Sequence, residues 1–160
     1  MITETDMAHL ARAVELAEQA LATGDEPFGS VLVDDSRTVL FEDHNHIAGG
    51  DSTQHPEFAI ARWAAENMTP EDRAKAVVYT SGEHCPMCAA AHAWVGLGRV
   101  VYASSSEQLG QWLAELGVPQ PPVKTLPIND IAPGLPVEGP VPELAAKVKV
   151  LHERSHGTGG

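Results

Sequence analysis

In the first forty positions, apolar residues are first spaced as on one face of a helix and then grouped in short runs typical of strands. Between positions 7 and 21 they recur every three or four residues, as on one face of a helix: Met7, Leu10, Val14, Ala17 and Leu21. Thr3 or Thr5 can cap this helix at its start, and Gly24 can end it. Two β-prone runs follow at 30–34 and 38–42, with polar residues between them, so we expect a hairpin there.

From residue 55 the pattern alternates between helical and extended segments. The predicted order is helix, strand, helix, strand and helix, at residues 55–67, 76–80, 85–95, 100–103 and 106–116. The polar stretch 43–54 that precedes them is predicted to be a loop. Strands that alternate with helices in this way predict an α/β fold, in which helices cover a sheet.

The C-terminal part of the chain has a different character, because most of the prolines lie in it. The segment 117–142 is predicted to be mainly extended or turning, with one short strand at 123–126. A last helix is expected at 141–153. We predict a single domain over 1–156 that includes this proline-rich segment, followed by a flexible tail at 157–160.

Composition and charge narrow the classes of function. A chain of 160 residues with 43% hydrophobic residues is long enough for one globular core. It has 10 basic and 22 acidic residues, for a net charge of −12, and the basic ones are scattered. Such a chain is repelled by phosphate backbones and anionic membranes, so we expect neither nucleic acid nor a membrane as a partner. The polar N-terminus and the lack of a long apolar run predict a cytoplasmic protein.

Two short clusters carry candidate chemistry: His55-Pro56-Glu57 and Cys85-Pro86-Met87-Cys88. Each lies where a loop enters a predicted helix, and the field at a helix N-terminus favours thiolates. One imidazole and two thiolates are good Zn²⁺ ligands that leave a fourth tetrahedral position for water. Zinc lowers the pKa of such a water to roughly 7. Glu57 is close enough in sequence to His55 to lie beside that water without binding the metal.

Other interpretations of these clusters were considered. The Cys-x-x-Cys pair could be a redox pair, but that chemistry gives His55 and Glu57 no purpose. A structural zinc site is a second alternative, in which His92, one helical turn after Cys88, supplies a fourth ligand. The stretch Gly96-Leu97-Gly98-Arg99 is not a dinucleotide fingerprint, because no third glycine follows and a strand comes next.

From the first helix to about Leu116, the chain resembles the cytidine deaminase superfamily, in particular its nucleobase branch of guanine, cytosine and tRNA adenosine deaminases. The motifs that carry the resemblance are Pro27-Phe28-Gly29-Ser30-Val31, Asp43-His44-Asn45-His46, His55-Pro56-Glu57, Tyr79-Thr80-Ser81-Gly82-Glu83, Cys85-Pro86-Met87-Cys88 and Trp94. The resemblance implies a three-layer α-β-α fold with a five-stranded mixed sheet, one catalytic Zn²⁺ and an oligomer, for which we expect a homodimer.

The resemblance also implies roles for single residues. His55, Cys85 and Cys88 would bind zinc, and Glu57 would be the proton shuttle. The remaining matches are to substrate-binding positions: Asn45 would hydrogen-bond the substrate ring, while Phe28 and Trp94 would line the base pocket. Asn45 could instead be an ordinary turn residue, and the two aromatic residues could be ordinary core.

The chain departs from the family pattern at three places. Pro56 stands where a residue with a backbone N–H is usual, so a donor to the substrate is missing. His84 stands in place of a proline, where it could orient a ligand, touch the leaving group or simply occupy a loop. The proline-rich segment could not be aligned, and Glu107, Glu138 or Glu143 from the C-terminal part could close the pocket.

The function predicted from the sequence is hydrolytic, zinc-dependent deamination of a free amino-nucleobase or related heterocycle. A guanine-deaminase-like activity is the first hypothesis, followed by cytosine, isoguanine or an aminotriazine as substrate. The alternatives are a tRNA adenosine deaminase and a non-catalytic structural zinc protein.

Overall fold

A five-stranded mixed sheet lies at the centre of the computed structural model, which describes residues 1–157. The strands are arranged in the order β2-β1-β3-β4-β5. β1 is antiparallel to both of its neighbours, while β3, β4 and β5 run parallel. The bounds of the strands are Gly29–Val33 for β1, Val39–His44 for β2, Val77–Gly82 for β3, Val100–Ser104 for β4 and Val137–Glu138 for β5. The α/β fold expected from the sequence is therefore confirmed.

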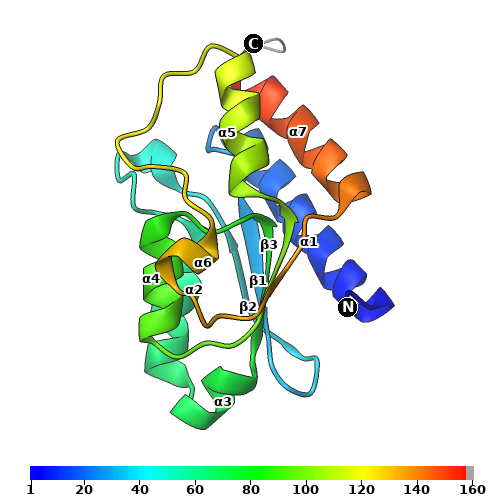
Figure 1. The fold of residues 1–160 in the computed structure, drawn as a ribbon, viewed down its shortest axis with the longest axis vertical. Helices are drawn as coiled ribbons and strands as arrows, with labels where there is room; N and C mark the ends of the chain where they lie inside the picture. Colours follow the sequence, from blue (N-terminus) through cyan, green and yellow to red (C-terminus); the bar gives the residue numbers. More distant parts are fainter. Residues whose placement is uncertain (158–160) are drawn as a thin grey trace.

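Helices cover the sheet on both sides (Figure 1). On one side lie α1 (Glu4–Ala22), α5 (Ser106–Glu115) and α7 (Pro142–His156). The other side carries α2 (Pro56–Asn67), α4 (Pro86–Trp94) and the short α6 (Ile128–Ile131), while α3 (Pro70–Lys75) follows α2 at one end of the molecule. Within residues 1–157, no helix has the length and apolar character needed to cross a membrane.

The first helix forms as the sequence predicts. Thr3 and Asp6 make a capping box, in which each side chain accepts a hydrogen bond from the backbone N–H of the other residue. The chain leaves the helix through Gly24, whose φ of +83° is a left-handed conformation that glycine adopts without strain. The predicted cap and stop are both confirmed.

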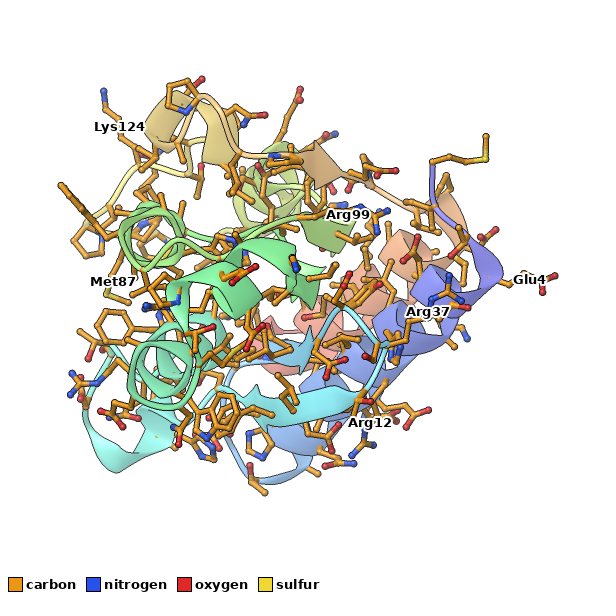
Figure 2. The ribbon with its side chains drawn as sticks, turned by 90° about the horizontal axis from the view of Figure 1, so that it is seen from below. Glu4, Arg12, Arg37, Met87, Arg99 and Lys124 are labelled. Carbon is orange, nitrogen blue, oxygen red and sulfur yellow. The ribbon has the colours of Figure 1, made fainter. Side chains whose placement is uncertain are left out.

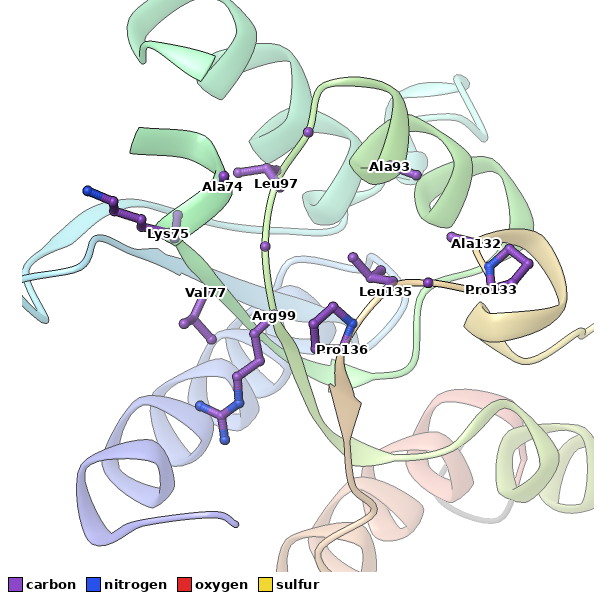
Figure 3. A pocket seen from close by; sticks show the side chains of 14 residues that line it. Ala74, Lys75, Val77, Ala93, Leu97, Arg99, Ala132, Pro133, Leu135 and Pro136 are labelled. Carbon is purple, nitrogen blue, oxygen red and sulfur yellow. The ribbon is translucent and has the colours of Figure 1, made fainter. Parts of the chain in front are cut away.

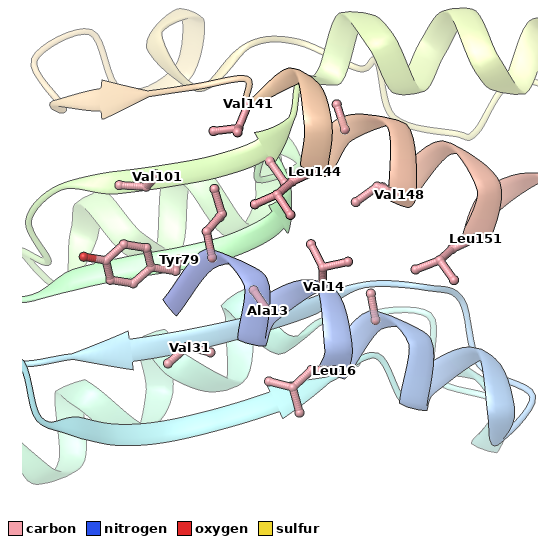
Figure 4. Close-up of a cluster of buried hydrophobic side chains, with 14 of the residues drawn as sticks. Ala13, Val14, Leu16, Val31, Tyr79, Val101, Val141, Leu144, Val148 and Leu151 are labelled. Carbon is pink, nitrogen blue, oxygen red and sulfur yellow. The ribbon is translucent and has the colours of Figure 1, made fainter. Parts of the chain in front are cut away.

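The alternation of side chains along the strands divides the core in two. Val31, Val33 and Tyr79 face α1 and α7, where they form the larger cluster with residues such as Leu144 and Val148 (Figure 4). The residues between them face α2 and α4, where the buried set includes Leu32, Val78, Ile60 and Leu97. Each aliphatic side chain buried in this way contributes roughly 1.5–3 kcal/mol. The second of these clusters packs α2, which carries His55 and Glu57 at its start, against the sheet.

The C-terminal segment differs from the prediction. No strand forms at 123–126 within the described residues; the fifth strand is β5, which pairs with β4 at Val100 and Val101. Pro121 and Pro122 lead into the predicted strand without backbone donors, and Val123 is 49% exposed, so neither pairing nor burial favours a strand there. Except for Gly157, the predicted tail lies outside the described residues.

Candidate metal centre and active site

The three predicted zinc ligands come together at the C-terminal end of β3. His55 is the N-cap of α2 and Cys85 is the N-cap of α4, so both helices begin at the site, and Cys88 lies in the first turn of α4. The His55 Nδ1 atom is 3.5 Å from the Sγ atom of Cys85 and 3.5 Å from that of Cys88. The N-terminal prolines of the two helices, Pro56 and Pro86, cost no hydrogen bond at this position.

These distances fit a zinc ion. Tetrahedral coordination with Zn–S bonds of about 2.3 Å and a Zn–N bond of about 2.0 Å places sulfur and nitrogen about 3.5 Å apart. A hydrogen bond from Cys88, together with one from His55, lowers the pKa of Cys85 to about 4, so this sulfur is a thiolate at neutral pH. Its negative charge, acting through the hydrogen bond, raises the pKa of His55 to about 9. The donor set and its spacing therefore match a zinc site with one open position.

Glu57 lies one residue into α2 and is only 5% exposed. Burial raises its pKa to about 7, although the charge of His55 and a hydrogen bond from Ser30 oppose this rise. A carboxyl group that titrates near neutral pH can both accept and return a proton there. The structure thus places a proton-transfer group next to the three ligands.

The hydroxyl of Ser30 contacts this carboxylate, and the hydroxyl of Thr80 contacts that of Ser30. Ser30 Oγ on β1 lies 3.0 Å from Glu57 Oε1 and 2.8 Å from Thr80 Oγ1 on β3. Ser30 and Thr80 face each other across the β1–β3 ladder and are fully buried. Both are polar residues in strands that are otherwise largely apolar, which is the signal that the sequence offered. The pairing of β1 with β3 and the packing of α2 bring Ser30 to Glu57 and Thr80 to Ser30.

Asn45 and Phe28 lie near each other at the ends of β2 and β1. The backbone N–H of Asn45 donates to the carbonyl of Phe28 at 3.0 Å, and the Asn45 side chain is buried. Its Oδ1 atom accepts a hydrogen bond from Ile47 N–H at 2.9 Å, which fixes the amide. The Phe28 ring packs against Gly82, where a Cβ atom would approach Phe28 Cε1 to 3.3 Å, and so lies beside the loop to Cys85.

Trp94 does not join this group. It is the last residue of α4 and its side chain is 89% exposed. The helical period places Trp94 about 200° from His92, which faces the interior, so Trp94 points away from the core. In this chain the side chain lies at the surface, and its assignment to the base pocket stays a prediction. Trp112, by contrast, is buried in the core, and Trp63 stacks on Phe41.

His92 is not a fourth metal ligand. Its Nε2 atom donates to the carbonyl of Gly98 at 2.7 Å, and its ring lies edge-on to that of His84. Among the described residues, the metal-binding group at this position consists of His55, Cys85 and Cys88. A closed Cys₂His₂ site, as the structural zinc alternative requires, is not formed. His84 itself is buried, and both of its ring nitrogens lack a hydrogen-bond partner within residues 1–157.

The acidic residues considered for closing the pocket lie elsewhere. Glu138 on β5 pairs with Arg99 and with the N-terminal amine. Glu107 and Glu143 are exposed in the first turns of α5 and α7. None of the three belongs to the metal-binding group.

Two cavities lie near these elements. One of about 430 Å³ opens beside His55 and is also lined by Phe58 and Arg62. Another, of about 720 Å³, is lined by residues such as Val77, Arg99 and Pro136 (Figure 3). These three residues lie at the N-terminal ends of β3, β4 and β5. The metal ligands follow the opposite end of β3, so the larger cavity is separate from the candidate site.

Comparison with known proteins was made against sequences and against solved structures. The chain is 35% identical over 108 residues to the probable cytosine deaminase of Schizosaccharomyces pombe, covering 68% of this chain and 65% of that one. It is 35% identical over 109 residues to the tRNA-specific adenosine deaminase of Haemophilus influenzae, covering 68% and 63%. The matched region is thus slightly less than two thirds of the length of these relatives.

The fold of a solved structure is similar over nearly the whole chain. The guanine deaminase from Nitrosomonas europaea superimposes with a TM-score of 0.69, covering 98% of this chain and 86% of that one, at 18% identity. The family described as the cytidine and deoxycytidylate deaminase zinc-binding region matches residues 3–104, which include every ligand of the candidate centre. Because the match extends over more than half of the chain, the protein belongs to this zinc-binding deaminase family.

Proposed function

We propose that this protein is a hydrolytic deaminase that replaces the exocyclic amino group of a heterocycle by oxygen and releases ammonia. The observation that carries the proposal is the arrangement of three zinc ligands around a buried carboxyl group. His55 Nδ1 lies 3.5 Å from both sulfurs, and Glu57 is 5% exposed with a pKa of about 7. Relatives named as cytosine and tRNA adenosine deaminases support the same reaction class.

In the proposed reaction, the carboxyl group of Glu57 transfers protons from the attacking water to the substrate. Zinc held by His55, Cys85 and Cys88 supplies the Lewis acid that makes water nucleophilic at neutral pH. The carboxylate of Glu57 accepts a proton from the attacking water and delivers it to a ring nitrogen. It then accepts the second proton of the former water, from the hydroxyl group now on the ring carbon, and transfers it to the amino group, which leaves as ammonia. Ser30 orients the carboxylate by donating to Oε1.

Asn45 and Phe28 are the proposed contacts to the ring of the substrate. The amide of Asn45 is held by Ile47 N–H through Oδ1, so its nitrogen is free to donate to a ring acceptor. Pro56 is buried and offers no N–H, so a ring carbonyl placed there would lose a hydrogen bond. An unmet buried acceptor costs about 1–3 kcal/mol, which weakens selection for such a carbonyl.

We further propose that the substrate is a small free base, with guanine the first choice and cytosine, isoguanine or an aminotriazine the next. The charge of −12 supports a small ligand over a nucleic acid. Figure 2 shows Arg12, Arg37 and Arg99 on the side of the molecule away from Met87, which marks the metal-binding turn, while Lys124 is the one labelled basic residue on the Met87 side. Arg12 and Arg99 are moreover paired with carboxylates of Glu42 and Asp6.

A tRNA adenosine deaminase is the second candidate, and the relative from Haemophilus influenzae favours it. Phosphate contacts made by lysine and arginine give affinities that fall steeply with salt. We expect no such binding here. Measured tRNA affinity that drops steeply between low and moderate salt would favour the second candidate.

The first test is a comparison of Glu57→Gln with the wild type, both loaded with zinc. We expect ammonia release from one of the proposed bases by the wild type. The variant should retain one zinc per chain and lose at least about 10²–10⁴ in kcat, because general acid–base catalysis contributes that much. Full activity of a zinc-loaded Glu57→Gln variant would refute the role of Glu57. Absence of ammonia release from every base by the wild type would refute the proposed substrate class.

The homodimer and the cytoplasmic location expected from the sequence stay predictions. Sedimentation velocity of the zinc-loaded protein distinguishes a dimer from a monomer. A single species at the mass of one chain would exclude the dimer.

A further inference from the structure

A second group of metal-binding side chains lies outside the candidate centre, at Asp25, His44 and His46. One ring nitrogen of each histidine and one carboxylate oxygen of Asp25 lie within 4.8 Å of one another. The three residues come from different segments: the turn that follows α1, the last residue of β2 and the loop beyond it. The two histidines flank Asn45 in the sequence.

The hydrogen bonds of the two histidines leave one nitrogen of each free to bind a cation. His44 Nδ1 lies 2.8 Å from the carbonyl oxygen of Asn45, so in the neutral ring Nδ1 carries the proton and Nε2 has a free lone pair. His46 Nε2 lies 2.8 Å from Asp43 Oδ1 and leaves Nδ1 unprotonated when the ring is neutral. Histidines that bind metals usually donate their other ring N–H to a carbonyl or carboxylate in this way.

Asp25 is held in place as a carboxylate. Its side chain is buried, Thr23 donates to Oδ2 at 2.7 Å, and Ala48 N–H donates to Oδ1 at 2.9 Å. These hydrogen bonds, the one from Thr23 above all, lower the pKa of Asp25. Each oxygen accepts one hydrogen bond and has a further lone pair for a ligand.

We propose that Asp25, His44 and His46 form a second binding site for a divalent transition-metal cation. Two imidazoles and one carboxylate are a ligand set that such cations bind with open positions left for water. A bound cation draws its ligand atoms to about 3–3.5 Å from one another. The two rings already lie close, with centroids 4.4 Å apart, and the exposed ring of His46 is free to close on the ion. Binding would tie the three segments together around Asn45.

The test uses the zinc-loaded protein dialysed against micromolar Ni²⁺, with both metals measured per chain. We expect one zinc and one nickel in the wild type. His46→Ala changes an exposed side chain and should keep the fold and the zinc but lose nickel affinity by at least about 10–100-fold. Asp43→Asn keeps all three ligands and removes the negative charge of the group that accepts from His46, so we expect about tenfold weaker binding. His156→Ala, on α7, is the matched control and should bind nickel as the wild type does.

Slower hydrogen exchange of the amides around residues 45–50 on nickel binding would locate the ion at this loop. Three outcomes overturn the proposal. They are nickel that replaces zinc with no gain in total metal, a wild type that binds no nickel, and nickel binding that persists unchanged in His46→Ala.

Discussion

At the scale of single residues, the candidate proton shuttle depends on a neighbour from a different strand. Ser30 donates to the Glu57 carboxylate and thereby stabilises its charged form, against the burial that raises its pKa to about 7. Thr80 contacts Ser30 from the adjacent strand, so the three groups form one buried chain of hydrogen bonds. Two buried β-strands therefore tune a group that belongs to a helix.

Ser30→Ala tests this coupling. Removing the hydroxyl removes a hydrogen bond to the ionised carboxylate, so the pKa of Glu57 should rise above its wild-type value. The variant should also lose about 1–3 kcal/mol of stability, because buried acceptors remain unpaired. The pKa is measured from the carboxyl carbon shift in NMR and the stability by urea unfolding.

Ser81→Ala is the matched control for this experiment. Ser81 is also buried on β3, but its hydroxyl accepts from Gly29 N–H and does not contact Glu57. This variant should lose stability without a change in the pKa of Glu57. Equal pKa values in Ser30→Ala and the wild type would contradict the coupling.

Metal binding should release protons in a number set by the three ligands. In the metal-free protein at pH 7, His55 is protonated because its pKa is about 9, and Cys85 is a thiolate because its pKa is about 4. Burial and the neighbouring Cys85 sulfur raise the pKa of Cys88, so it is a thiol. Zinc needs neutral imidazole and two thiolates, so about two protons should leave on binding, one from His55 and one from Cys88.

Calorimetry in buffers of different ionisation enthalpy counts these protons. The number of protons released should fall as the pH rises, because the pKa of His55 is raised to about 9. Above that pH His55 is already neutral, so the release should approach one proton. A release close to zero at pH 7 would show that the ligands are not in these protonation states.

At the scale of elements, one carboxylate joins two helices to the sheet. Glu83 follows β3, and its Oε1 accepts from Ser106 N–H at 2.8 Å while its Oε2 accepts from Ile128 N–H at 2.7 Å. These are the first residues of α5 and α6, whose N-terminal N–H groups lack partners within their own helices. Glu83 also lies two residues before Cys85, so the same turn positions a metal ligand.

Glu83→Ala should therefore destabilise the protein by about 3–6 kcal/mol, since it removes two hydrogen bonds to a charged group that contribute about 1.5–3 kcal/mol each. Urea unfolding measures this loss. Glu107→Ala is the matched control, because Glu107 is exposed in the first turn of α5 and interacts only with the helix dipole. We expect that change to cost less than about 1 kcal/mol. A loss in Glu83→Ala no larger than in the control would exclude the bridging role.

The elements that the sequence analysis missed share a physical cause. The helix α3 has a Thr69 cap and an N-terminal proline but no buried residue, so it lacks the apolar periodicity from which helices are predicted. β5 has two residues and pairs with β4 only because the chain returns past α6. Such short elements are fixed by their neighbours and not by their own pattern.

At the scale of the whole molecule, a partly buried ion-pair network ties the N-terminus to the sheet. Asp6 on α1 is 6% exposed and accepts hydrogen bonds from Arg99 at 3.1 Å and from the Tyr79 hydroxyl. Arg99 also pairs with Glu138 on β5 at 2.8 Å. Residues 93 positions apart in the chain thus fix α1 against the edge of the sheet where β5 is added.

This network predicts a loss of stability in acid. Burial raises the pKa of Asp6, but the hydrogen bonds from Arg99, Thr3 and Tyr79 outweigh it and hold the pKa below its ordinary value. A depressed folded-state pKa stabilises the folded protein above the unfolded pKa, about 3.9, and this contribution is lost as the pH falls below it. The free energy of unfolding should therefore decrease as the pH falls from about 5 to about 2.

Asp6→Asn should lower the free energy of unfolding by about 2–3 kcal/mol at neutral pH. This loss lies between those typical of breaking an exposed and a buried ion pair. The difference should shrink at pH 3. Glu71→Gln removes an exposed pair with Lys75 and is the matched control, with an expected change below about 0.5 kcal/mol. If Asp6→Asn had the same pH dependence as the wild type, the network would not be the cause.

The sequence by itself indicated which side chains form the candidate metal centre, because each of the two motifs is local; the fold brings His55 to the cysteines 30 and 33 residues later. A histidine and two cysteines, each placed where a loop enters a helix, predict three ligands, and Glu57 is carried by the same helix as His55. The amphipathic period of α1 and the alternation of strands and helices likewise determined the α/β layers. Such features depend on spacings of two to four residues, which any reader of the sequence can follow.

Only the tertiary structure decided what surrounds these ligands. It placed Ser30 against Glu57 and Thr80 against Ser30, left Trp94 exposed, and directed His92 to Gly98 instead of to the metal. It also brought Asp25 to the two histidines that flank Asn45. These contacts depend on which strands pair and which face of a helix turns inward, and those choices are made by burial over the whole chain.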